Sequence, residues 1–124
     1  KKAGYLVLGA TISLKEGNLE EIKALTRELS EKRTSKQPLE FPSAGSTFKR
    51  PEGYFAGKLI MDSGLRGYQI GGARVSDKHC GFVINAGDAT AQDVVALMDH
   101  VTEVVREKYG VTLEPEVKFL GDFN

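Results

Sequence analysis

The chain has 124 residues, enough for one compact domain with a single core and too few for two independent domains. Its 40% hydrophobic and 27% charged residues are typical of a soluble globular protein and exclude a disordered or fibrous chain. Lys and Arg number 17 and Asp and Glu number 17, so no overall field attracts nucleic acid or an anionic membrane, and any anion site must be local.

No run approaches the roughly 20 apolar residues that span a bilayer, and no charged-then-apolar leader opens the sequence. The one cysteine, Cys80, cannot form an internal disulfide and has no neighbours at metal-ligand spacing. We therefore expect a cytoplasmic protein without a bound metal, with Cys80 as a small half-buried side chain. Because a strand-like pattern follows Lys1 almost at once, we also expect the chain to be part of a longer polypeptide.

Residues 5–14 alternate apolar with smaller or polar side chains, which predicts a strand with one buried face. Asn18 then has the pattern of a helix N-cap, with Glu21 three residues later. Apolar residues recur at helical spacing as far as Arg33 and predict an amphipathic helix. They are Leu19, Ile22, Leu25 and Leu29.

Residues 34–50 contain Pro38, Pro42 and Gly45, each of which opposes regular structure. We expect a long loop here, and loops of this length in a compact domain are usually functional or disordered. Pro51 suits the first turn of a short helix that continues to about residue 60 and ends at Gly64.

Residues 67–75 and 81–85 have the character of two strands around a turn at 76–78, so a hairpin is expected. Gly71 and Gly72 inside the first strand predict a bulge or a close backbone approach. Thr90 with Asp93 resembles a capping box for the longest helix, which ends at Gly110, and a last strand is expected from 117 to 120. This order predicts an α+β fold with a mixed sheet packed with helices.

The sequence contains no complete motif for several common chemistries. Residues 53–58 imitate a phosphate loop but are one residue short, and Leu59 stands where a Ser or Thr would bind magnesium. No dinucleotide fingerprint is present, and Ser46 lacks the second glycine of a nucleophile elbow. His79 and His100 are too isolated for a convincing metal site.

Three segments, 43–51, 71–79 and 114–118, together supply a hydroxyl, cations, an imidazole and a carboxylate. Such groups can hold an anionic substrate while a proton moves. The candidates are Ser46, Lys36, Arg50, His79 and Glu116. Each has an ordinary alternative, because a serine often caps a turn, basic loop residues are usually solvated, and Glu116 follows Pro115 on a possible edge strand. The residues by themselves indicate an anion-binding α+β domain.

The runs 41–60, 71–79 and 113–118, taken in order, resemble the UDP-N-acetylenolpyruvoylglucosamine reductase family, and the similarity extends over essentially the whole chain. The resemblance implies a flavoenzyme of peptidoglycan precursor synthesis. In this family NADPH reduces FAD, and the hydride then passes to the enolpyruvyl double bond of UDP-N-acetylglucosamine enolpyruvate to give UDP-N-acetylmuramate. FAD is held mainly by N-terminal flavin-binding domains of the same polypeptide, which this chain does not contain.

The resemblance further implies that residues 1–14 are the closing strand of the flavin portion and that residues 15–124 are the UDP-sugar substrate-binding domain. The chain alone is then expected to be inactive. Ser46 matches the family's proton donor to the carbon beside the substrate carboxylate. Glu116 matches the carboxylate that assists this step, by orienting a water, by holding the donor hydroxyl or by donating a proton itself.

The substrate-binding residues are also implied by the family. Lys36 matches a lysine that contacts the substrate diphosphate. Arg50 stands where some members have asparagine, and His79 where some have glutamine. Tyr54 and Lys58 are further substrate-binding candidates.

Two alternatives from other classes remain. In the first, the chain is a nucleotide-sugar binding module without catalysis of its own. In the second, it is a small nucleic-acid-binding α+β domain that uses the basic loop from Lys32 to Arg50. The zero net charge and the few aromatic residues in that loop disfavour the second, because such binding usually depends on a basic surface. We therefore expect neither nucleic acid nor a membrane as a partner.

Overall fold

The computed structural model describes residues 7–121. The chain divides into two compact units, one up to Lys32 and the other from Arg33 onward. The helix α1 (Leu19–Lys36) runs from the first unit into the second. The expected domain boundary after residue 14 remains a prediction.

The strand predicted for residues 5–14 is not formed in residues 7–14, and residues 5 and 6 lie outside the described part of the chain. A strand needs a neighbouring strand for its backbone hydrogen bonds. Among the described residues, no strand pairs with this segment. The alternating pattern is therefore present without the sheet that it would join.

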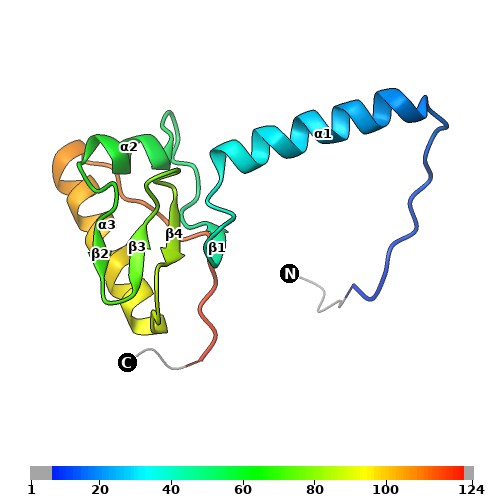
Figure 1. The fold of residues 1–124 in the computed structure, drawn as a ribbon. Coiled ribbons are helices and arrows are strands. Elements are labelled where there is room, and N and C mark those ends of the chain that lie inside the picture. The colour runs from blue at the N-terminus through cyan, green and yellow to red at the C-terminus, as the bar shows by residue number, and fades with distance from the viewer. Residues whose placement is uncertain (1–6, 122–124) are drawn as a thin grey trace. The chain divides into compact units, whose positions relative to one another are not determined.

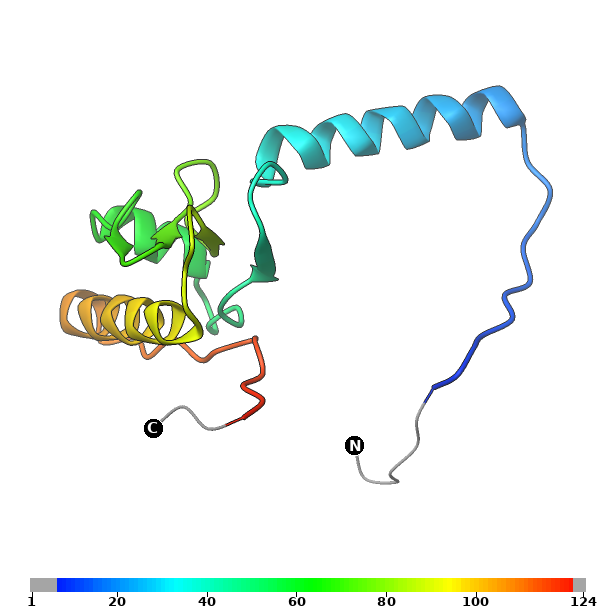
Figure 2. The same cartoon turned by 60° about the horizontal axis from the view of Figure 1, so that its bottom comes forward.

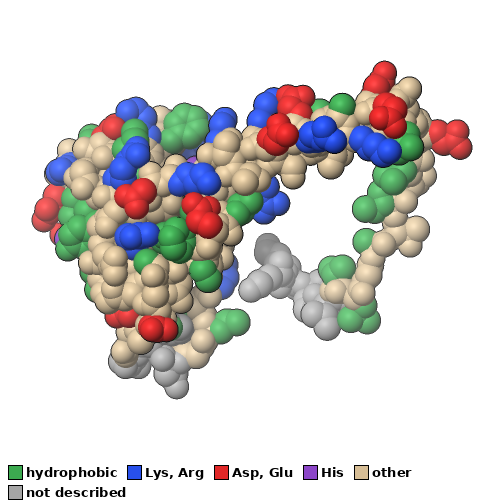
Figure 3. Space-filling model, viewed as in Figure 1, with side chains coloured by type: hydrophobic (Ala, Val, Ile, Leu, Met, Phe, Trp, Pro, Cys, Tyr) green, Lys and Arg blue, Asp and Glu red, His purple; other side chains and the backbone are tan. Residues whose placement is uncertain are grey.

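The helix α1 begins where the sequence predicts and ends three residues later than Arg33. The side-chain oxygen of Asn18 accepts hydrogen bonds from the backbone N–H groups of Glu20 and Glu21, at 3.0 and 3.2 Å, which confirms the N-cap. Oppositely charged side chains about one turn apart form ion pairs along the helix (Figure 3). The apolar stripe is exposed rather than buried, with Leu25 and Leu29 each 55% accessible.

The second unit is built on a four-stranded sheet with the order β1-β4-β3-β2 (Figure 1). Its strands are β1 (Ser43–Ser46), β2 (Gln69–Ile70), β3 (Ala73–Val75) and β4 (Phe82–Asn85). The helix α3 (Ala91–Tyr109) covers one face of the sheet, and α2 (Ala56–Asp62) lies beside the loop between β3 and β4 (Figures 1 and 2). The predicted α+β class is confirmed.

The sheet is antiparallel in every described pair and not mixed, which corrects one detail of the prediction. The reason is the length of the connections. Two glycines join β2 to β3, and six residues join β3 to β4, whereas a parallel pair needs a crossover of a dozen residues or more.

Three predicted boundaries are also wrong. The helix expected from Pro51 begins at Ala56, because the backbone N–H of Tyr54 donates to the Pro51 carbonyl at 3.1 Å and closes a separate turn. The long strand 67–75 is interrupted at Gly71 by a turn with φ of +53°. No strand forms at 117–120, and the C-terminal segment instead makes one bridge, from Pro115 to Phe48.

Gly72 confirms the predicted close backbone approach. A Cβ atom at this position would overlap the Gly87 carbonyl oxygen and the backbone of Ala89. The turn between β2 and β3 is therefore pressed against the segment that leads into α3.

The core lies between α3, α2 and the inner face of the sheet. Its fully buried members include Ile60, Val75, Leu97, Met98, Val101 and Val105. The α3 helix that supplies most of them is capped at both ends as predicted. Thr90 and Asp93 form a capping box, and Gly110 ends the helix with φ of +68°.

Candidate functional site

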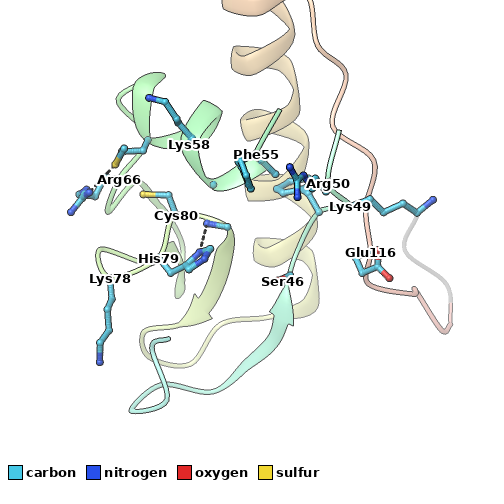
Figure 4. Close-up of a pocket in the computed structure, with 15 residues that line it drawn as sticks. Ser46, Lys49, Arg50, Phe55, Lys58, Arg66, Lys78, His79, Cys80 and Glu116 are labelled. Carbon is cyan, nitrogen blue, oxygen red and sulfur yellow. Dashed lines mark hydrogen bonds between the residues drawn. The ribbon is translucent and has the colours of Figure 1, made fainter. Parts of the chain in front are cut away.

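A pocket of about 550 Å³ opens in the second unit (Figure 4). Its walls are Ser46 and residues 48–50 at and after the bend of β1, residues 55–58 and Met61 around α2, the loop 78–81 before β4, Arg66, and Glu116 from the C-terminal segment. Five of the seven predicted site residues therefore lie around one cavity. They are Ser46, Arg50, Lys58, His79 and Glu116.

A β-bulge brings Ser46 to this pocket. Ser43 pairs with Ile84 and Ser46 pairs with Phe82, so β1 has one more residue than β4 between the two pairs. Gly45 takes a φ of +84° at this point. Without the extra residue, side-chain alternation would place Ser46 on the same face as Val83, which is part of the core packed against α3.

Thr47 occupies that core-facing position instead. Its side chain is 3% exposed, and its hydroxyl oxygen accepts a hydrogen bond from the buried Val83 backbone N–H at 2.9 Å. Two neighbouring hydroxyl residues thus point to opposite sides of the sheet edge, Ser46 to the pocket and Thr47 to the core.

The C-terminal segment places Glu116 on the same pocket. The Glu116 backbone N–H donates to the Thr47 carbonyl at 2.9 Å, and the Lys49 N–H donates to the Glu114 carbonyl at 2.8 Å. Leu113, which is 2% exposed, anchors the segment in the core. Residues 46 and 116 are far apart in the sequence, and their side chains are brought to one cavity by this pairing (Figure 4).

The pocket is strongly cationic although the whole chain is neutral. Its lining contains five basic side chains and, among the described residues, a single carboxylate, that of Glu116. The basic residues are Lys49, Arg50, Lys58, Arg66 and Lys78. Such a wall attracts an anion even when the net charge is zero.

Three of these cations are already paired with carboxylates outside the pocket lining. The pairs are Lys49–Glu114 at 2.8 Å, Lys58–Asp62 at 2.7 Å and Lys78–Glu40 at 3.5 Å. The hydrogen bond that Lys49 donates to Glu114 raises the pKa of Lys49, and the one that Lys58 donates to Asp62 raises the pKa of Lys58. Both ammonium groups stay charged throughout the physiological range.

Arg50 is held differently. Its guanidinium lies over the ring of Phe55, 4.0 Å from the ring centroid, and its Nε donates to the Tyr54 carbonyl at 3.3 Å. No described carboxylate forms an ion pair with it. The two terminal nitrogens can therefore donate together to an incoming anion, which is the geometry in which arginine binds best.

His79 is half-buried in the loop before β4. Its Nδ1 accepts a hydrogen bond from the Gly81 backbone N–H at 3.1 Å (Figure 4), and its ring packs edge-on against Phe82 with centroids 4.9 Å apart. Cys80, next to it in the lining, is buried, and burial raises the pKa of its thiol. Cys80 is therefore buried, at 6% exposed, rather than half-buried as the sequence predicts.

Two predicted residues lie elsewhere. Lys36 is exposed in the last turn of α1 and does not line the pocket. Tyr54 lines a neighbouring hollow of about 320 Å³ together with Lys49, Arg50 and Glu114. Neither position tests the role that the sequence predicts for these two side chains.

Sequence reasoning did not single out Arg66, Lys78 or Phe55 as site residues. Lys78 is adjacent to His79, so its place in the motif 71–79 was an available signal. Arg66 comes from the turn after α2 and had none. Its guanidinium is fixed by donating to the Asp77 carbonyl at 3.1 Å and to the Met61 sulfur at 3.0 Å.

No helix in the described part of the chain has both the length and the apolar character needed to cross a bilayer. No group of three or more His, Cys, Asp or Glu side chains in residues 7–121 is arranged to hold a metal ion.

Comparison with known proteins adds names to this geometry. Residues 37–120 match the model of the family described as "UDP-N-acetylenolpyruvoylglucosamine reductase, C-terminal domain". A UDP-N-acetylenolpyruvoylglucosamine reductase of Lachnoclostridium phytofermentans is 66% identical over 122 residues, and one of Caldanaerobacter subterraneus subsp. tengcongensis is 59% identical over 118 residues. These alignments cover 98% and 95% of this chain and 39% of each relative.

A solved structure agrees with them. The crystal structure of UDP-N-acetylenolpyruvylglucosamine reductase (MurB) from Thermus caldophilus superimposes with a TM-score of 0.66 and 38% sequence identity, over 84% of this chain and 37% of that one. The chain thus spans about two fifths of the length of the relatives it matches. The family match, the high identities and the shared fold together show that this chain belongs to the UDP-N-acetylenolpyruvoylglucosamine reductase family, of which it represents the C-terminal part.

Proposed function

We propose that the full-length protein is a UDP-N-acetylmuramate dehydrogenase, which reduces UDP-N-acetylglucosamine enolpyruvate to UDP-N-acetylmuramate for peptidoglycan synthesis in the cytoplasm. The observation that carries the proposal is the convergence of Ser46 and Glu116 on one pocket with five basic side chains. A substrate that carries a diphosphate and a carboxylate needs this combination of cations with a proton donor. Membership of the family supports the same reading over that of a binding module alone.

The described residues of the pocket fit the anionic substrate. The pocket offers cations and hydrogen-bond donors, and no dinucleotide fingerprint occurs in the sequence. In the proposal FAD is held by the part of the full-length protein outside this chain. When bound and reduced by NADPH, it supplies the hydride for the enolpyruvyl double bond.

The contribution of this chain is to hold the substrate and to complete the proton transfer. Once hydride has reached the carbon farther from the carboxylate, the adjacent carbon carries enolate-like charge and needs a proton. The Ser46 hydroxyl would deliver it. Glu116, on the facing C-terminal segment, would assist by orienting that hydroxyl or a water, or by supplying a proton itself.

Substrate anions would be bound on the cationic wall. Arg50 is the best placed of the five, because its stacking on Phe55 fixes the guanidinium before the ligand arrives. Lys58 and His79 line the same wall. Lys36 and Tyr54 would reach the substrate only in the context of the full-length protein.

The test is the Ser46→Ala variant of the full-length protein. We expect turnover to fall by about 10²–10⁴-fold, since a positioned proton donor contributes that much, while reduction of the flavin by NADPH is unchanged. Stopped-flow absorbance separates the two half-reactions. Ser43→Ala is a matched control, because Ser43 lies on the same strand, is exposed and is outside this pocket. Unimpaired turnover of Ser46→Ala would remove Ser46 from the mechanism.

A further inference from the structure

His79 is the pocket residue whose orientation is most completely fixed by its surroundings. Its backbone N–H donates to the Ser76 hydroxyl at 3.3 Å, and its carbonyl accepts from the Phe82 N–H at 2.9 Å. Its ring is held by the edge contact with Phe82 and by the Gly81 N–H on Nδ1. A side chain tied at both backbone and ring loses little further freedom when it binds a ligand.

Two glycines create the space for this ring. A Cβ atom at Gly81 would lie 2.9 Å from His79 Cε1, and one at Gly57 would lie 3.3 Å from the same atom. Neither glycine has a positive φ, so backbone conformation does not explain them. The close approach of the imidazole explains Gly81, and at Gly57 a Cβ atom would also lie 3.1 Å from the Gly81 backbone nitrogen.

The hydrogen bond on Nδ1 also determines where the ring proton lies. A backbone N–H can only donate, so Nδ1 must be the unprotonated, accepting nitrogen. In the neutral ring the proton is then on Nε2. Nε2 has no hydrogen-bond partner among the described residues, and His79 lines the pocket.

We propose that His79, in its Nε2–H tautomer, donates a hydrogen bond to an oxygen of the UDP-sugar, and that Gly81 is the positioning residue that sets this tautomer and the ring orientation. The inference rests on the proposed function for the identity of the ligand. It goes beyond it by assigning the donor atom of His79 and by giving roles to Gly81 and Gly57, which the sequence motifs do not assign.

The decisive experiment compares two near-isosteric variants of the full-length protein. In His79→Asn, the amide oxygen replaces Nδ1 and keeps the bond to Gly81, but nothing replaces Nε2. In His79→Gln, the amide nitrogen reaches the position of Nε2 and can still donate into the pocket. We expect His79→Asn to raise KM for UDP-N-acetylglucosamine enolpyruvate about tenfold with kcat nearly unchanged, and His79→Gln to stay within about threefold.

A purely structural role of the imidazole would impair both variants alike, so equal KM values for the two would overturn the inference. The outcome is separable from that of the proposed function. Wild-type protein that fails to bind this UDP-sugar in a calorimetric titration overturns both proposals. Wild-type protein that binds it, together with an unaffected His79→Asn variant, overturns this one alone.

Gly81 is tested through His79. We expect Gly81→Ala to raise KM as His79→Asn does, because its Cβ atom would displace the ring. It should add nothing in a His79→Asn background, because both changes act through the same hydrogen bond from residue 79 to the ligand. Additive effects would contradict the positioning role. Nitrogen-15 NMR of histidine-labelled wild-type protein at alkaline pH gives an independent test, with His79 identified by its absence from His79→Asn. The Nε2–H signature supports the assignment, and an Nδ1–H signature would refute it, independently of the KM values of the variants.

Discussion

Thr47 separates the pocket from the core. Its buried hydroxyl satisfies the Val83 backbone N–H, and its own carbonyl accepts from the Glu116 N–H. One residue therefore joins β4 to the segment that carries the candidate carboxylate. A buried donor left without a partner costs more than an ordinary hydrogen bond contributes, so this hydroxyl matters more than its size suggests.

Thr47→Val keeps the shape of the side chain and removes the acceptor of the Val83 N–H. We expect the variant to lose about 1–3 kcal/mol of stability against local opening of β4, because the buried N–H loses its partner. Native-state hydrogen exchange of residues 82–85 in the full-length protein measures this loss. The exposed Thr112→Val change is the control and should stay within about 0.5 kcal/mol. Equal protection in both variants would contradict the proposed importance of this bond.

The α3 helix depends on its capping box for more than the helix start. The Asp93 carboxylate accepts from the Thr90 N–H at 2.9 Å and from the Gly72 N–H at 3.4 Å, so it also fixes the turn between β2 and β3. The Thr90 hydroxyl accepts from the Asp93 N–H at 3.1 Å. The Thr90 N–H, chiefly, lowers the pKa of the Asp93 carboxyl.

This lowered pKa makes the cap sensitive to acid. Since the folded-state pKa of Asp93 is below its unfolded value of about 3.9, the stabilisation is complete above the unfolded pKa and is lost as the pH falls through the folded one. We expect Asp93→Asn to weaken hydrogen-exchange protection of α3 at neutral pH and to match the wild type increasingly closely below about pH 4. Asp99→Asn, in the middle of the exposed side of the helix, is the control. A difference from wild type that does not change with pH would exclude the carboxylate as the cause.

The second unit is completed by its C-terminal segment. Residues 113–116 return alongside 47–49, and the backbone pairing there is what places Glu116 beside Ser46. The segment has few backbone bonds, so its attachment depends on the buried Leu113. Packing at one leucine in the core is therefore coupled to the geometry of the candidate site.

Leu113→Ala should destabilise the unit by about 2–5 kcal/mol, the usual cost of truncating a buried leucine. We also expect it to lower turnover of the full-length protein at temperatures where the rest stays folded, because Glu116 is no longer held on the pocket. Hydrogen exchange at the Lys49 and Glu116 amides would report the detachment. Leu120→Ala, at a position that is 89% exposed, should change neither property. Normal turnover in a Leu113→Ala variant whose Lys49 and Glu116 amides have lost protection from exchange would argue against a role for Glu116.

Local signals in the sequence predicted the parts of this fold that depend on local interactions. Asn18, the Thr90–Asp93 box and Gly110 each act on the nearest turn of their own helix, so they could be recognised without knowing the tertiary structure. The segment 117–120 has a strand pattern as well. It forms no strand because strand formation depends on a partner, and β1 bends at its bulge before it could pair there.

The candidate site was predictable only in part, because its residues come together through tertiary packing and not through local interactions. Spacing in the sequence could not show that residues 46 and 116 line one pocket, and that expectation came from the family resemblance. Arg66 was not predicted, because a basic residue in a short turn has no local mark of a binding role, and only the packing of the turn brings it to the pocket. Phe55 was not predicted either, because its role at the site is to support the guanidinium of Arg50, a contact that only the structure shows.

The bulge in β1 has a consequence for how this motif tolerates change. Ala44 is exposed and has room for a larger side chain, whereas the φ of +84° favours glycine at residue 45 although a Cβ atom there would meet nothing within 4 Å. The segment can therefore accept substitution at Ala44. Its length has no such freedom. Losing one residue between Ser43 and Ser46 would exchange the two hydroxyls, turning the serine into the hydrophobic interior and the threonine outward. Sequence variation between residues 43 and 46 should therefore consist of substitutions, and insertions or deletions should be avoided.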